Sequence, residues 1–108
     1  MGTDEPLSED ELSAIERRVA AASPGPWVGW LESRHGIGGS SFIELPGDVE
    51  VDDELYLTRA TGGRRVGGAH AQTDADIDFI AGARQDVPRL VSEVRRLRAA
   101  LEEARSAD

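Results

Sequence analysis

The chain has 108 residues, a formal net charge of −9 and no cysteine. Its length suits one small domain, and the missing cysteines exclude disulfides, thiolate metal sites and thiol nucleophiles. All twelve basic residues are arginine, so Schiff-base chemistry and P-loop phosphate binding, which use lysine, are excluded as well. The acidic balance argues against DNA as a partner and suits a basic protein.

The N-terminal stretch is acidic, whereas a signal peptide needs a positive region followed by an apolar core. No apolar run approaches the ~20 residues of a membrane span. We therefore expect a cytoplasmic protein that has no membrane partner.

The first predicted element is a helix over residues 8–22. Ser8 and Glu11 have the spacing of a capping box, and Leu7 can pack on Leu12 as a hydrophobic staple. Pro24 and Pro26 follow the apolar positions and end the helix.

Residues 27–66 change to the alternating pattern of short strands, at 27–31, 41–45, 49–51 and 55–57, separated by glycine-rich or acidic turns. They predict an antiparallel β-meander of three or four strands. The glycines at 62–63 and 67–68 predict a loop that exposes Arg64, Arg65 and His70. Trp27 and Trp30 are expected on opposite faces of their strand, one in the core and the other exposed.

A helix pair is predicted over residues 73–106. Thr73 caps the first helix, and Pro88, which suits only a first turn, opens the second and longer one. The predicted fold class is therefore α+β, a single domain over residues 1–108: an N-terminal helix, a short antiparallel meander and two C-terminal helices.

The last helix carries apolar residues at alternating steps of three and four, the spacing of a coiled-coil seam. β-Branched residues at the a positions with leucine at d favour a parallel homodimer, and Glu93 and Arg98 have the offset at which charges of two parallel chains meet. Covering the sheet of its own chain is the alternative role for this helix. The predicted dimer interface consists of Val87, Leu90, Val94, Leu97, Arg98 and Leu101.

Loop arginines are the best candidates for binding a small anion in this acidic chain, although pairing with nearby acids is the more common role of such residues. The candidate ligand-binding residues are Arg34, Arg59, Arg64, Arg65, His70 and Trp30.

No metal site and no catalytic residue are expected. Asp48, Glu50 and Asp52 have the first spacings of an EF-hand, but the glycine at position 6 and the flanking helices are missing, so a solvent-facing strand is favoured. His35 and His70 are the only imidazoles, and neither has a partner at metal or triad spacing.

Two segments, Ala21–Trp27 and Asp74–Leu90, resemble a family of small actinobacterial and phage proteins. The family combines a "TPGPW" turn with a "DAxFIAxARxDVPxLL" helix pair, and some members are similar to Ead-type phage early-region proteins. This chain departs from the pattern at Ser23, where threonine is usual, and at Ile77 and Asp78. The resemblance implies a mobile-element accessory protein, with no catalytic residues to carry over.

The function we expect is non-enzymatic: binding and sequestering a partner, as phage anti-defence proteins do, without a cofactor. The alternative is a small-molecule sponge of the nucleotide-binding type that uses the loop arginines at a dimer interface. An enzyme centred on His35 or His70 is the least favoured hypothesis.

Overall fold

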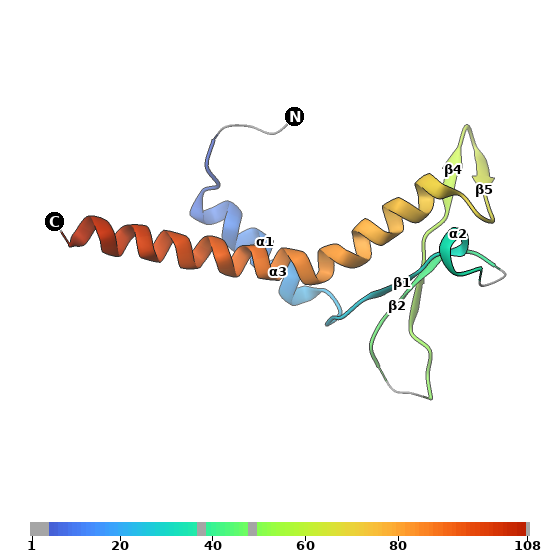
Figure 1. Cartoon of the computed structure of the whole chain (residues 1–108), viewed down its shortest axis with the longest axis horizontal. Coiled ribbons are helices and arrows are strands. Elements are labelled where there is room, and N and C mark those ends of the chain that lie inside the picture. Colours follow the sequence, from blue (N-terminus) through green and yellow to red (C-terminus); the bar gives the residue numbers. More distant parts are fainter. Residues whose placement is uncertain (1–4, 37–38, 48–49, 108) are drawn as a thin grey trace. The chain divides into compact units, whose positions relative to one another are not determined.

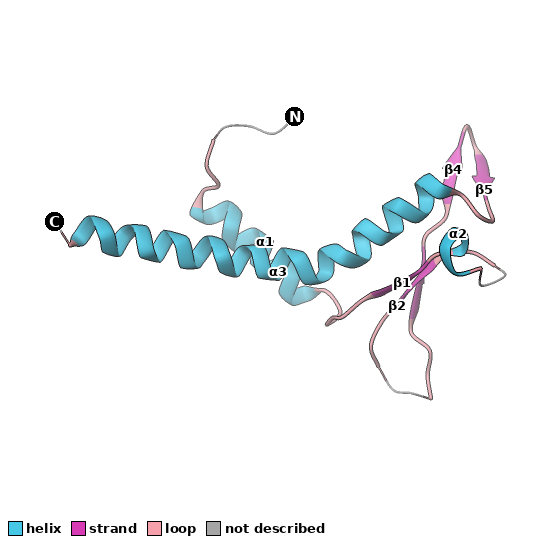
Figure 2. Ribbon diagram, in the orientation of Figure 1, coloured by secondary structure: helices cyan, strands magenta, loops and turns pink. Residues whose placement is uncertain are grey.

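A computed structural model describes residues 5–36, 39–47 and 50–107, and it is a mixed α+β structure, which confirms the predicted fold class (Figure 1). Figure 2 shows the helices and strands along the chain. The elements are α1 (Glu9–Ala21), β1 (Val28–Trp30), α2 (Glu32–His35), β2 (Phe42–Glu44), β3 (Glu54–Tyr56), β4 (Arg59–Thr61), β5 (Arg64–Val66) and α3 (Ala71–Ser106).

The chain divides into two compact units. Unit 1 consists of residues up to Ala22 together with those from Asp86 onward, and unit 2 is Ser23–Gln85. Unit 1 therefore holds α1 and the second part of α3, and unit 2 holds every strand, α2 and the first part of α3.

α1 begins with the predicted capping box. The Ser8 hydroxyl accepts a hydrogen bond from the Glu11 N–H at 3.0 Å, and the Glu11 carboxylate accepts one from the Ser8 N–H at 3.0 Å. Two of the donors that a helix start leaves without an intrahelical partner are satisfied in this way. The predicted helix agrees with the observed one to within one residue at each end.

β1, β2 and β3 form an antiparallel sheet in the order β1-β2-β3, so β2 is central. Val28, Glu44 and Glu54 lie opposite one another in register, as do Trp30, Phe42 and Tyr56. The expected strand at 49–51 is wrong where the structure describes it, since Glu50 and Val51 lie in a turn and a bend; Val49 lies outside the described residues.

The loop expected around Arg64 and Arg65 is also wrong, because these residues form β5, which pairs with β4 in a separate two-stranded hairpin. Gly62 and Gly63 connect the two strands with φ angles of 60° and 78°. Two successive positive φ angles are what a two-residue type I′ hairpin turn requires, and glycine adopts them without strain. The glycine pair is therefore a hairpin turn rather than a loop signal.

The core of unit 2 consists of Leu31, Ile43, Ile77 and Ala81, with Trp27 packed against it. The central strand contributes Ile43, and one face of α3 contributes Ile77 and Ala81. Trp27 is thus the tryptophan at the core, and Trp30 is the exposed one.

The predicted helix pair is a single continuous helix, α3, that begins two residues before Thr73 and contains Pro88. A proline inside a helix removes one N–H donor and crowds the preceding turn. Good helix formers such as alanine, leucine, arginine and glutamate dominate the turns after Pro88, so the helix continues through it. Reading Pro88 as a helix start was therefore wrong.

The Pro-Gly-Pro-Trp turn is fixed to α3 by the side chain of Gln85. The Trp27 N–H donates to the Gln85 Oε1 at 3.2 Å, and the Gln85 Nε2 donates to the Trp27 carbonyl at 3.4 Å. A Cβ on Gly25 would lie 3.2 Å from the Arg84 Cγ and 3.3 Å from the Gln85 Oε1, which is a tight fit. The turn can therefore approach the helix closely because residue 25 is glycine.

Candidate functional site

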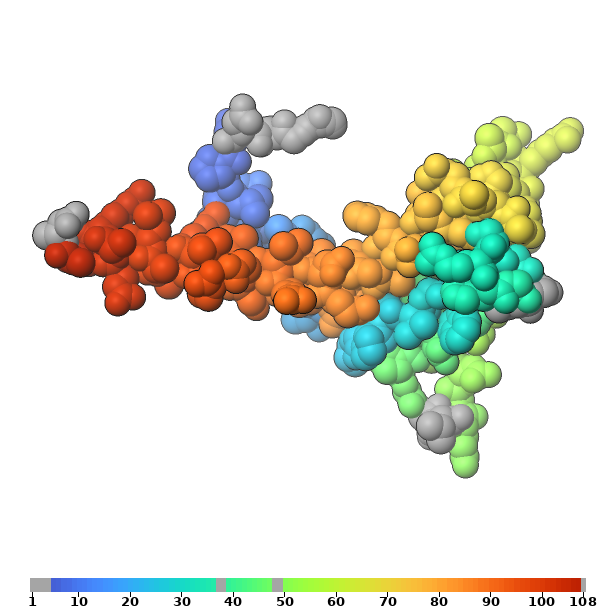
Figure 3. All heavy atoms as spheres, viewed as in Figure 1, coloured from blue at the N-terminus to red at the C-terminus, as the bar shows by residue number. Residues whose placement is uncertain are grey.

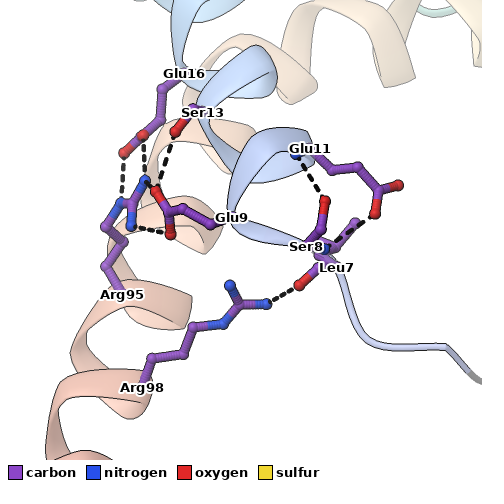
Figure 4. A network of polar contacts seen from close by, with 8 residues as sticks. All are labelled: Leu7, Ser8, Glu9, Glu11, Ser13, Glu16, Arg95 and Arg98. Atoms are coloured by element: carbon purple, nitrogen blue, oxygen red, sulfur yellow. Dashed lines mark hydrogen bonds and ion pairs between the residues drawn. The ribbon is translucent and has the colours of Figure 1, made fainter.

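In unit 1, one arginine of α3 binds two carboxylates of α1 (Figure 4). The Arg95 guanidinium lies 2.8 Å from the nearest Glu9 oxygen and 2.6 Å from the nearest Glu16 oxygen. Its hydrogen bonds lower the pKa of Glu9 from 4.5 to about 2 and also lower the pKa of Glu16. One turn later, Arg98 donates to the Leu7 carbonyl at 2.6 Å. We call Arg95, Glu9 and Glu16 the arginine fork.

The side of α3 that packs on α1 differs from the side that carries its three leucines. Val91 is buried, and it lines a small pocket of unit 1 together with Val19 and Ala20 of α1. Leu90, Leu97 and Leu101 are 62%, 52% and 51% exposed. At 100° per residue these three leucines fall within about 40° of one another around the helix. We call them the leucine row.

The predicted seam is therefore only partly covered within the chain. Val87 and Val94 are half-buried, whereas the leucine row is open. In the space-filling view the last turns of α3 (red, Figure 3) extend past the cover of α1, and residues 99–107 are all exposed.

Glu93 and Arg98, whose offset suits an ion pair between two parallel chains, both make contacts within their own chain. Glu93 accepts a hydrogen bond from Arg96 of the same helix at 2.5 Å, and Arg98 binds the Leu7 carbonyl. Each residue therefore has a partner within its own chain, because an arginine side chain reaches three positions along a helix or across to α1.

In unit 2, one face of the three-stranded sheet carries a row of aromatic side chains. Trp30, Phe42 and Tyr56 are cross-strand neighbours, and the Phe42 and Tyr56 rings stack with centroids 5.1 Å apart. Residues two apart in a strand share a face, so Glu44 and Glu54 lie on this face too. Trp30 is 36% exposed and Tyr56 57% exposed. We call Trp30, Phe42 and Tyr56 the aromatic row.

Both carboxylates of this face hold an aromatic side chain in place. The Trp30 indole N–H donates to the Glu44 Oε1 at 3.0 Å, and the Tyr56 hydroxyl donates to the Glu54 Oε1 at 3.0 Å. The hydrogen bond to Glu54 raises the pKa of Tyr56, so the phenol stays protonated. Beside them, Glu44, Asp52 and Asp53 contribute to the wall of a hollow of about 390 Å³.

Sequence reasoning named Trp30 but missed the aromatic row. Phe42 and Tyr56 each stand two residues from a glutamate, which is a pattern visible in the sequence. Only the strand register shows that the two rings are neighbours of each other and of Trp30.

Two of the four predicted ligand-binding arginines are paired with acids of α3. Arg59 donates to Asp76 and to Thr73, and an Arg34 guanidinium nitrogen lies 3.9 Å from an Asp78 oxygen. Arg64 and Arg65 follow each other in β5 and so point to opposite faces of the hairpin. The structure therefore does not gather the four arginines around one site.

The two histidines have structural contacts. The His70 Nδ1 accepts a hydrogen bond from the Thr73 N–H at 3.2 Å, so it caps the start of α3, the role expected of Thr73. The His35 Nδ1 accepts one from the Leu31 N–H at 2.9 Å, and its ring meets Trp30 edge-on. His70, expected in an exposed loop, is half-buried at this cap.

A buried carboxylate joins α3 to α2. Asp74 accepts hydrogen bonds from the Ser33 N–H at 2.7 Å and from the Ser41 hydroxyl at 2.5 Å, and the Ser41 Oγ accepts one from the Glu32 N–H at 2.8 Å. Burial would raise the pKa of Asp74, but the hydrogen bonds from Ser33 and Ser41 outweigh it and hold the pKa below its usual value. We call Asp74, Ser33 and Ser41 the Asp74 cluster.

Among the residues that the structure describes, no group of three histidine or acidic side chains is placed to hold a metal ion. Asp48, the first residue of the EF-hand-like spacing, lies outside the described residues. Over the same described ranges, no helix combines the length and apolarity that crossing a membrane requires.

Comparisons with protein-family models, with curated proteins and with solved structures find no significant match to this chain. The resemblance to phage and actinobacterial proteins thus stays a prediction.

Proposed function

We propose that this protein is a non-enzymatic binding protein that acts by associating with other protein chains, and that it is a homodimer joined through the leucine row. The observation that carries the proposal is the exposure of Leu90, Leu97 and Leu101 on one side of α3. Leucines exposed along one side of a helix, rather than singly, are typical of a surface that is covered in an assembly.

The charge around the leucine row supports a second copy as its partner. The whole chain has a net charge of −9, and two such chains repel each other. Residues 86–107, however, contain five arginines and four carboxylates. The segment is nearly neutral and carries both signs, so two copies can meet there without net repulsion.

The exposed end of α3 supports the same proposal. Residues 99–107 extend the helix past its contacts with α1, and short helical stretches without tertiary packing are marginal in water. A second α3 packed along Leu97 and Leu101 would supply that packing, in a helix pair or a four-helix arrangement of two α1–α3 hairpins.

Light scattering with chromatography tests the dimer. We expect the wild-type protein at tens of micromolar to have the mass of two chains. Leu97→Glu combined with Leu101→Glu should give a folded monomer, because each dimer would bury four carboxylates without partners. Ala99→Glu combined with Ser106→Glu adds the same charge to the same end of α3, on the side away from the leucine row, and it should remain dimeric.

A wild-type monomer at that concentration would refute the dimer. Equal loss of the dimer in both double variants would mean that added charge, rather than the leucine row, controls association. Circular dichroism at 222 nm checks that each variant keeps its helices.

Sequestration of a partner, in the manner of a phage or mobile-element anti-defence protein, remains part of this proposal and rests on the resemblance of the two end segments. The small-molecule sponge is less well supported, because Arg34 and Arg59 already neutralise carboxylates of α3.

A further inference from the structure

We propose that the open face of the three-stranded sheet binds an arginine-rich segment of a basic partner protein, with guanidinium groups lying on the aromatic row and near Glu44 and Glu54. This surface belongs to unit 2, so the inference does not depend on the leucine row or on the dimer. It names the chemistry of the partner that the protein sequesters.

Aromatic rings are concentrated on this face of the sheet. The chain has only five aromatic residues of the Trp, Tyr and Phe types, and three of them stand side by side on this face. The opposite face of the same strands contributes Ile43 to the core, so the aromatic row is not needed to cover that core. Guanidinium groups stack on aromatic faces, and they do so more readily than ammonium groups.

Two acidic side chains are paired unfavourably on the same face. Glu44 and Glu54 lie directly opposite each other on β2 and β3, and like charges in that position destabilise a sheet. A guanidinium placed between them would convert repulsion into two charge-assisted hydrogen bonds, and its planar fork suits two carboxylates.

Two of the three rings are already held in place by contacts within the chain. Trp30 is fixed by its hydrogen bond to Glu44, and Tyr56 by its bond to Glu54 and its stacking on Phe42. Side chains already held in place lose little conformational entropy when a partner binds. Exposed rings without such bonds would lose more.

The negative charge of this face decides which of the ligands that stack on aromatic rings can bind there. Single-stranded nucleic acids also use such platforms, but they combine them with basic grooves that hold the phosphates. Here the acids are Glu44, Glu54 and the neighbouring Asp52 and Asp53, which repel phosphate. A cationic peptide matches both the rings and the acids.

The test uses an acetylated and amidated octapeptide of alternating glycine and arginine, titrated into the full-length protein at low salt and followed by tryptophan fluorescence and calorimetry. The same peptide with citrulline in place of arginine keeps the shape and loses the charge. We expect the arginine peptide to bind with a Kd on the order of 100 µM and the citrulline peptide at least tenfold more weakly.

Two sets of variants locate the binding. Glu44→Gln with Glu54→Gln should weaken the arginine peptide about tenfold, whereas Glu102→Gln with Glu103→Gln removes the same charge from α3 and should change the Kd less than twofold. Tyr56→Ser, at an exposed position, should weaken binding about threefold. Phe79→Ser, at an exposed ring outside the sheet, should leave the Kd unchanged.

Several outcomes would overturn the proposal. One is the absence of binding at millimolar arginine peptide, and another is equal binding of the citrulline peptide. A third is equal weakening by the two pairs of glutamine variants, which would mean that the peptide responds only to overall charge. Tighter binding of oligothymidylate than of the arginine peptide would assign the face to nucleic acid instead. None of these results depends on whether the wild-type protein is a dimer.

Discussion

Each unit has a cluster of charged hydrogen bonds that joins two helices, and the two clusters differ in burial. Unit 1 uses the arginine fork, in which Arg95 joins α1 to α3 at the surface. Unit 2 uses the Asp74 cluster, in which a buried carboxylate joins α3 to α2 and to Ser41. Both are charge-assisted, but the Arg95 side chain is 37% exposed, whereas Asp74 is 3% and Ser41 5% exposed. Burial, rather than the number of bonds, should therefore decide how much each cluster stabilises the fold.

The largest effect is expected from Asp74→Ala. The substitution leaves the buried Ser41 hydroxyl and the partly buried Ser33 N–H without their acceptor, which costs about 2–3 kcal/mol of unfolding free energy. Urea unfolding followed by circular dichroism measures it. Asp78→Ala is the matched control. This side chain, one turn further along α3, is exposed and lies 3.9 Å from Arg34, so its loss should change the unfolding free energy by less than about 0.5 kcal/mol.

Similar changes in unfolding free energy for Asp74→Ala and Asp78→Ala would contradict the idea that burial makes the Asp74 cluster the more stabilising one. Asp74→Asn is a further test. Its amide keeps one acceptor oxygen, so it should lower the unfolding free energy less than Asp74→Ala does.

A smaller effect is expected from Arg95→Ala. Its fork is exposed and screened by water, so the thermal midpoint should fall by only about 2–4 °C. Arg96→Ala removes an arginine that binds Glu93 within the same helix and should lower the midpoint less. If Arg95→Ala lowered the thermal midpoint as much as Asp74→Ala does in the same assay, burial would not be what determines the stabilising effect of each cluster.

The smallest expected effect is a change in the stabilisation by the arginine fork at low pH. The folded-state pKa of Glu9 is about 2, lowered from 4.5 by Arg95, so its contribution is present above pH 4.5 and is lost as the pH falls toward 2. The difference in thermal midpoint between wild type and Arg95→Ala should shrink over that range. A difference that stays constant down to pH 2 would contradict the assignment of this pKa to the arginine fork.

Local signals predicted much of the fold. The capping box at Ser8 and Glu11 defined the start of α1 because both partners lie within one turn. The strand at Phe42–Glu44 followed from alternation. The turn at Gly62 and Gly63 was misread because glycine pairs occur in loops and in tight hairpins alike, and only the register of β4 with β5 distinguishes them. Pro88 was misread because helix propensity around it outweighed one missing bond.

The candidate surfaces were less predictable. The leucine row could be found, since helical spacing is local, but the burial of Val91 against α1 required the tertiary structure. The aromatic row brings together residues from three strands, and no spacing in the sequence fixes their alignment. The same holds for Asp74, which looks like one more acid in a run of aspartates and is distinguished only by its burial.

The side-chain amide of Gln85 pairs with the backbone of Trp27 as a residue of a neighbouring β-strand would. It accepts a hydrogen bond from the Trp27 N–H and donates one to the Trp27 carbonyl. A search for homologues can exploit this. Glutamate at that position would lose the donor and a hydrophobic residue would lose both groups, so chains that keep the Gly-Pro-Trp turn should also keep an amide 58 residues after the tryptophan. The pair of positions, rather than either motif alone, is the signature by which distant relatives should be recognisable.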